Sequence, residues 1–276
     1  RNWTPPLTAD LLGNKVLGMK GLLTREHPYH ANAEVTHFLA RRGTKCVGRI
    51  SAAVNRRFND YYGSYSKIGS FGFFEVEEDY EVAAALLNAA REWIAGKGMT
   101  SMRGPGEYSN ATHERQGTLI DGFDTPPTVE CIHNPPFYQQ FLERWGLEKV
   151  KDYHAYIFST DTVPADRLAR VAAAVRQRNN VTTRVAKLED WTEEIGRVTS
   201  VYNRAWASNW GFLPITPDEA DAIAETLRPI VDPGLVRFAM LDGEVVAVLG
   251  AFPDPNWALR PRWGLLGDSD PVRLAR

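Results

Sequence analysis

The sequence lacks several features that would place a chain of this size in a class at once. Its two cysteines, Cys46 and Cys131, have no metal-ligand spacing and form no disulfide framework. No apolar run approaches the roughly 20 residues that span a bilayer. No secretory signal pattern opens the chain. Because the net charge is only −2 over 276 residues, the composition predicts neither nucleic acid nor a membrane as a partner.

The same scarcity of cysteine favours a reducing, cytoplasmic setting, in which we expect both thiols to be small buried side chains. His27, His30 and His37 follow no metal-ligand spacing, so no metal is predicted. The chain begins with Arg1 and stops at Arg276, where β-type residues begin again. We therefore expect the sequence to be a piece of a longer gene product.

What is present is an ordinary globular composition, 43% hydrophobic and 24% charged. Residues 35–54 predict two strands turned at Gly43, and "IGSFGFFEV" predicts a buried strand. The polar, tyrosine-rich stretch 55–66 between them predicts a loop. A helix follows, because its apolar residues repeat on one helical face, namely Val82, Leu86, Ala90 and Trp93.

The first half of the chain continues with a strand at "MTSMRGP", a helix over "NPPFYQQFLERWG" ended by Gly146, and a strand at "KDYHAYIF". A second unit begins with a helix after Pro164 whose apolar face carries Leu168, Val171 and Val175. The short strand "VTTRVA" and the long helix "DWTEEIGRVTSVYNRAWASNW" come next.

The last predicted elements are a helix opened by the capping box of Thr216 and Glu219 and a hairpin turned at Asp242-Gly243. This hairpin resembles the first one, because Phe38 and Phe238, and likewise residues 43 and 243, stand at matching places. The predicted class is therefore a mixed α/β fold repeated in tandem, with a first domain at 1–158 and an incomplete second copy at 159–276.

Several of these stretches resemble the GNAT superfamily of acyl-CoA-dependent N-acyltransferases. "ALLNAAREWIAGKGMTSMRG" is similar to the helix after the cofactor loop of that superfamily and to the strand beyond it. "FYQQFLERWGLEKVKDYHAY" resembles its later helix and strand. More narrowly, "NWTPPL", "FGFFE", "DGFDTPP" and "YNRAWASNWGFLPIT" resemble a poorly characterised bacterial group of GNAT-like proteins. The resemblance implies acetyl-CoA or another acyl-CoA as co-substrate and no metal.

One departure from the superfamily concerns the loop that holds the cofactor's pyrophosphate, R/Q-x-x-G-x-G/A. The matching stretch here, "EEDYEVAAALL", has no glycine and no basic residue. Its carboxylates suit a helix N-terminus but repel a pyrophosphate. We therefore expect the first domain to bind CoA weakly or not at all in the usual way. For the full-length group, the resemblance implies that the second unit carries the intact loop past Arg276, in which case the chemistry lies there and the present residues form the acceptor side of the site.

The resemblance also supplies the candidate catalytic residues. Glu75 lies on the strand that splays to admit the pantetheine arm, where a carboxylate could act as the base for an amine. The usual tyrosine acid is replaced by Leu142, and Tyr138 lies one turn back on the same face. The alternatives are a solvent-facing glutamate and an aromatic anchor for the helix.

Two groups of binding residues are expected. The cofactor group comprises Phe73, Phe74, Val76 and Asn134, although Asn134 is first of all expected to cap the helix after it. The acceptor group comprises Tyr202, Asn203, Asn209 and Trp210. Tyr202 and Trp206 at spacing i, i+4 are also explained as core.

The predicted function is N-acyl transfer from an acyl-CoA to an amine of a small molecule or peptide, in a possible homodimer. The alternative is a non-catalytic GNAT-like module that binds a ligand or a partner.

Overall fold

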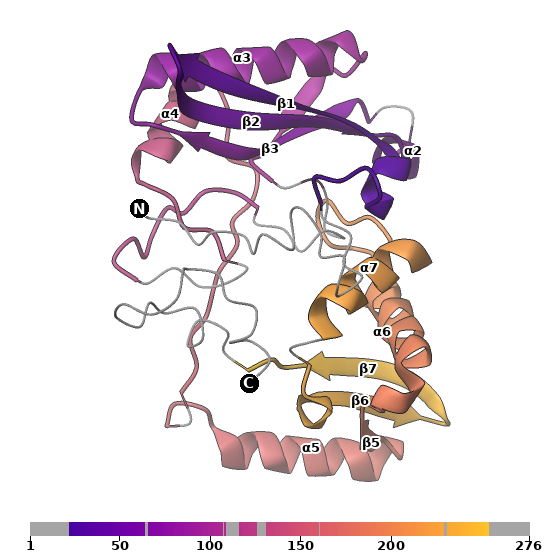
Figure 1. The fold of residues 1–276 in the computed structure, drawn as a ribbon. Coiled ribbons are helices and arrows are strands. Elements are labelled where there is room, and N and C mark those ends of the chain that lie inside the picture. The colour runs from indigo at the N-terminus through magenta and orange to yellow at the C-terminus, as the bar shows by residue number, and fades with distance from the viewer. Residues whose placement is uncertain are drawn as a thin grey trace, which may run out of the picture. The chain divides into compact units, whose positions relative to one another are not determined.

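The computed structural model describes residues 22–63, 66–106, 108, 116–125, 131–159, 161–228 and 231–253 (Figure 1). The chain divides into two compact units. Unit 1 comprises Arg1–Val150 with Gly211–Pro214, and unit 2 comprises Lys151–Trp210 with Ile215–Arg276. Each unit has its own sheet with helices, so the predicted mixed α/β class is confirmed.

Unit 1 is built on a four-stranded sheet in the order β1-β2-β3-β4, antiparallel except for the last pair. Its strands are β1 (Ala33–Arg42), β2 (Lys45–Asn55), β3 (Ile68–Val76) and β4 (Ser101–Arg103). Its helices are η1 (Pro28–Ala31), α2 (Arg56–Tyr61), α3 (Tyr80–Gly96) and α4 (Phe137–Trp145). The predicted first hairpin is confirmed, with Gly43 at φ 61° in its turn.

The loop predicted over 55–66 is wrong in its first half, because α2 occupies Arg56–Tyr61. Asn55 ends β2 and at the same time caps this short helix, its Oδ1 accepting from the backbone N–H of Phe58 at 3.0 Å. A helix of six residues is too short to show a hydrophobic period, so the sequence pattern did not reveal α2.

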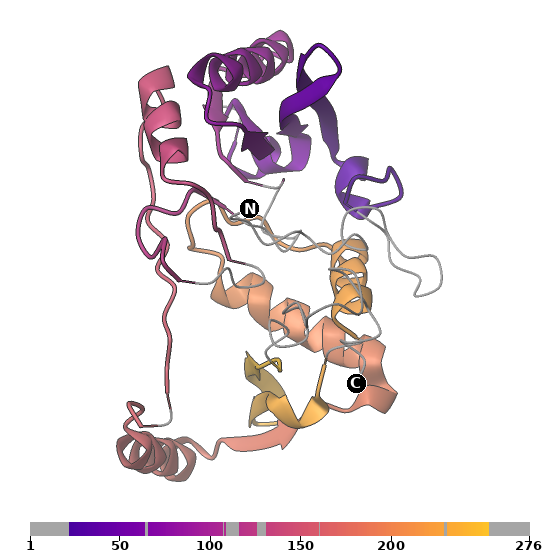
Figure 2. The same cartoon turned by 60° about the vertical axis from the view of Figure 1, so that its left-hand side comes forward.

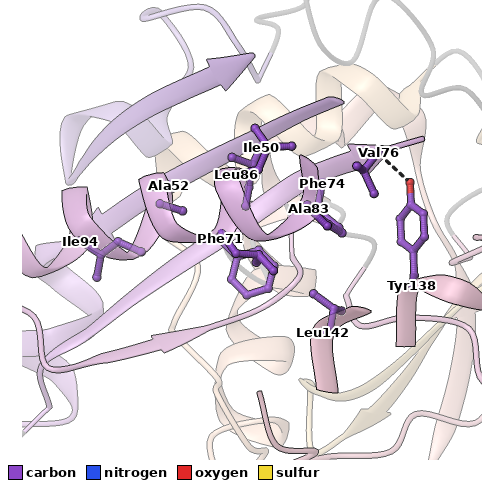
Figure 3. Close-up of a cluster of buried hydrophobic side chains, with 12 residues drawn as sticks. Ile50, Ala52, Phe71, Phe74, Val76, Ala83, Leu86, Ile94, Tyr138 and Leu142 are labelled. Atoms are coloured by element: carbon purple, nitrogen blue, oxygen red, sulfur yellow. Dashed lines mark hydrogen bonds between the residues drawn. The ribbon is translucent and has the colours of Figure 1, made fainter. Parts of the chain in front are cut away.

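The main core of unit 1 lies between the sheet and the helices α3 and α4 (Figure 3). Glycines in the strands let α3 approach closely: a Cβ on Gly69 would lie 2.4 Å from Ile94 Cγ2. The buried cluster consists of Ile50, Ala52, Phe71, Phe74, Val76, Ala83, Leu86, Leu87, Ala90, Ile94, Tyr138 and Leu142.

A β-bulge interrupts β3 in its second half. The register passes from Arg49↔Glu75 to Ser51↔Gly72, so β3 has one more residue than β2 across this step. Phe73 takes φ 46° there, which is unusual for a residue with a Cβ. The parallel partner β4 pairs only with residues 68–70. The end of β3 is therefore bent and lies beyond its ladder with β4.

Unit 2 has a three-stranded antiparallel sheet in the order β5-β6-β7. Its strands are β5 (Thr182–Val185), β6 (Val236–Leu241) and β7 (Glu244–Gly250). Its helices are α5 (Ala165–Asn179), η3 (Leu188–Asp190), α6 (Trp191–Ala205), α7 (Pro217–Leu227) and η5 (Pro233–Leu235). The predicted turn at Asp242-Gly243 is confirmed, with both residues at positive φ. The capping box of Thr216 and Glu219 is confirmed as well.

Three further sequence predictions are wrong. Residues 151–158 form no strand and are exposed throughout, since alternation alone supplies no ladder partner. Trp206 was expected in the core, yet it stacks on Tyr202 and remains substantially exposed. Cys46 is exposed rather than buried, although it lies in β2. Among the described helices, none is long and apolar enough to cross a bilayer.

Candidate functional site

The structure joins the two predicted catalytic residues by a hydrogen bond. The Tyr138 hydroxyl donates to Glu75 Oε2 at 2.8 Å. The same hydroxyl accepts from the backbone N–H of Val76 at 3.1 Å (Figure 3). Glu75 and Val76 end the bulged strand β3, and Tyr138 lies in the first turn of α4. Residues 63 positions apart are thus brought together where β3 extends past β4.

Local structure explains why Tyr138 reaches this point. Its ring is buried and packs edge-on against Phe74, with centroids 5.4 Å apart. Phe74 belongs to the core on the α3 side of the sheet, while Phe73 belongs to a second buried cluster with Tyr108. Phe73 and Phe74 enter different clusters because consecutive strand residues point to opposite faces, whereas the bulge brings Phe71 and Phe74 into the same cluster although they are three positions apart. The Val76 N–H donates to the tyrosine hydroxyl at a point that β4 does not reach.

The environment keeps Tyr138 protonated. Burial raises the pKa of its hydroxyl well above the ordinary value, and the negative charge of Glu75 raises this pKa further. The hydroxyl is consequently a hydrogen-bond donor over the physiological pH range. Its partner is the Glu75 carboxylate, whose orientation it fixes.

Arg49 is a further member of the site that the sequence did not reveal. It stands opposite Glu75 in the β2–β3 register, and its positive charge acts on the Tyr138 hydroxyl. Its Nε is buried and has no hydrogen-bond partner among the described residues. The sequence gives no register between β2 and β3, because α2 and a loop separate the two strands and the bulge shifts their pairing by one residue.

The N-terminus of α3 does not fit a pyrophosphate. Asp79 caps the helix itself, since its Oδ1 accepts from the backbone N–H groups of Glu81 at 3.0 Å and Val82 at 3.4 Å. Arg42 bonds the other Asp79 oxygen at 2.7 Å, and Lys45 pairs with Glu77. The hydrogen bond from Arg42, followed by the one from the Val82 N–H, lowers the pKa of Asp79. A fixed carboxylate thus occupies the position that an anionic ligand would take.

The predicted cofactor group is divided by the structure. Phe73 and Phe74 pack in the two clusters described above, and the Val76 N–H is bonded to Tyr138. The predicted cap by Asn134 is wrong, because Pro136 takes the N-cap position of α4 without a side-chain bond. Asn134 is buried and instead accepts from the Leu119 N–H at 2.7 Å, holding a loop against the entry to α4.

The predicted acceptor group lies at the end of α6 and in the turn after it. Asn203 bonds both backbone groups of Ile215, accepting from its N–H at 2.8 Å and donating to its oxygen at 2.9 Å. The backbone N–H of Asn209 donates to the Trp206 oxygen at 2.8 Å, and Trp210 is exposed. Asn203 therefore positions the segment before α7, and Trp210 presents an indole ring at the surface.

Comparison with known proteins gives two similar chains. A protein of Caulobacter vibrioides named bacterial ceramide synthase is 32% identical over 266 residues, covering 96% of this chain and 66% of that protein. Protein YghO of Escherichia coli is 30% identical over 259 residues, covering 94% and 63%. The chain thus spans just under two thirds of the length of these curated relatives. No family model matches the sequence.

Proposed function

We propose that the chain is the part of an N-acyltransferase that acts on the amino group of a long-chain amino alcohol. The relative named bacterial ceramide synthase supports the substrate class, because a ceramide is the amide of a fatty acid with such an amine. The observation that carries the proposal in this chain is the Glu75–Tyr138 pair at the end of β3. A GNAT-like tandem fold remains part of the proposal, supported by the matching hairpins of units 1 and 2.

In this reaction the amine attacks the carbonyl carbon of an acyl thioester. As the C–N bond forms, Glu75 takes the proton that the nitrogen loses. The C–S bond breaks, the sulfur leaves with the electron pair, and the proton then passes to it. The products are one amide and one free thiol, and no metal or oxidant is required.

Two neighbours adapt Glu75 to this role. Tyr138 holds one carboxylate oxygen by a hydrogen bond and stays protonated, so it positions the base without competing for the proton. Arg49 supplies a buried N–H next to the same strand end, suited to the oxygen of the carbonyl that becomes negative during attack. No step is assigned to the N-terminus of α3, which its own Asp79 occupies.

The test is amide formation by the purified chain, given a fatty acyl-CoA and a long-chain amino alcohol and followed by mass spectrometry. Glu75→Gln keeps the size of the side chain and can still accept from Tyr138, so the variant should fold. We expect kcat to fall by roughly 10²-fold or more, as for loss of a general base. Glu77→Gln is the matched control, because Glu77 ends the same stretch in an exposed pair with Lys45.

Tyr138→Phe tests the positioning role. We expect kcat to fall roughly tenfold, since Glu75 loses the hydrogen-bond donor that fixes its carboxylate. Equal activity of the Glu75→Gln and Glu77→Gln variants would contradict the assignment of the base.

A second candidate function, a non-catalytic binding module, is favoured by one observation: Asp79 and Tyr138 already satisfy the helix N-terminus and the strand N–H that a CoA would use. Calorimetry of the folded chain with free CoA separates the candidates. Absence of both heat and amide formation would support the module. Micromolar binding that Asp79→Ala leaves unchanged would show that CoA docks elsewhere than at α3, because CoA at that helix N-terminus should bind more tightly once the carboxylate is removed.

A further inference from the structure

Helix α5 (Ala165–Asn179) is exposed on every side. None of its residues is buried, and its three large aliphatic side chains, Leu168, Val171 and Val175, are 54%, 55% and 43% exposed. An isolated helix of this length is marginal in water, because packing normally supplies most of a helix's stability. Figures 1 and 2 show α5 leading into β5 at the edge of the unit 2 sheet.

The apolar side chains of α5 form one stripe. At 3.6 residues per turn, Leu168, Val171, Ala172 and Val175 fall within about 100° of the helix circumference. Alanines and polar residues occupy the remainder. Such a stripe needs an apolar surface to cover it, and within the described part of the chain no side chain of α5 is buried by one.

The charges of α5 are arranged about this stripe. Arg176 flanks it on one side, and Arg167 and Arg178 flank it on the other, by the same helical geometry. With Arg170 and the single acidic residue Asp166, the helix has a formal charge of +3. No ion pair joins these arginines to any described residue. Their long side chains can reach outward to anionic groups while their methylenes lie along an apolar layer.

The segment before α5 adds bulky apolar side chains. Tyr156, Ile157 and Phe158 are exposed, Ile157 by 93%, and the rings of Tyr156 and Phe158 are stacked. Aromatic side chains of this kind are favoured at the boundary between lipid headgroups and acyl chains. We call α5 and the exposed residues 156–158, which precede it in the chain, the α5 surface.

We propose that the α5 surface binds the face of an anionic lipid bilayer, with α5 lying in the plane of the headgroups. Basic side chains flanking a narrow apolar stripe are the pattern of an interfacial helix. The helix has 15 residues and does not span a bilayer. The net charge of −2 averages over the whole chain and conceals this local excess of positive charge. The inference does not depend on the proposed acyl transfer, although a lipid amine would be found at such a surface.

The test is co-sedimentation of the chain with vesicles of phosphatidylcholine alone and of equimolar phosphatidylcholine and phosphatidylglycerol. We expect binding to the mixed vesicles, weakened by added salt, and slower hydrogen exchange over residues 165–179 when they are present. The variant L168N/V171N/V175N should bind roughly tenfold more weakly or not at all. The matched control A173N/A174N/Q177N changes three residues on the opposite side of α5 and should bind as the parent does.

Three results would overturn the proposal. One is equal binding of both triple variants. Another is slow exchange over 165–179 without vesicles, which would mean that protein already covers the stripe. The last is a dimer in solution that L168N/V171N/V175N dissociates, with no vesicle binding by the parent, which would make a second copy the occupant. Circular dichroism checks that both variants remain folded, and because the readout is vesicle binding, its failure is separate from failure of amide synthesis.

Discussion

The hairpins β1–β2 and β6–β7 both close across a two-residue turn but differ in what covers them. Each places a glycine at positive φ in the turn, Gly43 or Gly243, and each has a one-residue register shift near that turn. In unit 1 the second strand pairs with β3 and packs under α3, so most of β2 is buried. In unit 2 the second strand, β7, is largely exposed.

This difference separates what local sequence determines from what tertiary packing adds. The turn and the alternation are sufficient to form a hairpin in both units. Only the third strand of unit 1 brings the bulge at Phe73, and with it the meeting of Glu75 and Tyr138. A hairpin is thus the common framework, while the candidate site depends on β3 and α4, which unit 1 adds to that framework.

The largest expected effect that tests this comparison is on stability. Ile50→Ala removes an aliphatic group that is 1% exposed beneath α3, and we expect a loss of about 2–5 kcal/mol from the free energy of unfolding of unit 1. Leu249→Ala in β7, where the side chain is 64% exposed, should cost less than about 0.5 kcal/mol. Both losses in the free energy of unfolding can be measured by hydrogen exchange of the amides of each hairpin at increasing urea concentration. Equal losses would show that β7 is covered.

A smaller loss of stability is expected from a substitution where α3 approaches the sheet of unit 1. Gly69→Ala would place a Cβ 2.4 Å from Ile94 Cγ2, so α3 must move, and we expect a loss of about 1–3 kcal/mol in unit 1. Gly250→Ala is the matched change in unit 2, where the nearest atom would be 3.9 Å away. It should leave the unfolding midpoint unchanged, and a large loss there would contradict the open packing around β7.

The smallest effect concerns an exposed ion cluster of unit 1. A hydrogen bond from Lys97, followed by one from Arg56, lowers the pKa of Glu34 from 4.5 to about 2. Because the folded-state pKa is depressed, the cluster stabilises the fold above about pH 4.5 and loses this contribution as the pH falls toward 2. The difference in melting temperature between the parent and Glu34→Gln should therefore shrink on acidification. Added salt should reduce it at neutral pH, and a difference independent of pH would contradict this role.

Sequence patterns predicted the elements whose signals are local. Both hairpins, the strand at 68–76 and the capping box at Thr216 follow from turn residues, period and cap chemistry. The predictions failed where the local structure depends on contacts with another part of the chain. Residues 151–158 alternate like a strand but find no ladder, and Asn134 stands two residues before the position that caps α4.

The candidate site was predicted only in part, for a related reason. Glu75 and Tyr138 were proposed separately from a family resemblance, and their hydrogen bond depends on the bulge at Phe73 and on the packing of α4. Arg49 gave no signal, because a charged residue in a strand usually faces solvent. The run of carboxylates at the start of α3 indicated that this helix end suits negative charge. Only the structure shows that Asp79 is the residue that caps it.

The hydrogen bond between Glu75 and Tyr138 also has a consequence for the order of folding. It closes a loop of 63 residues, whereas the β1–β2 hairpin closes across a two-residue turn. Loop-closure entropy makes distant pairings slower to form than local ones. The Val76 amide, which donates to the same tyrosine, should gain protection in a pulse-labelled refolding reaction only after the amides of β1 and β2 have done so. The chain would then assemble its candidate site last, on a sheet that is already in place.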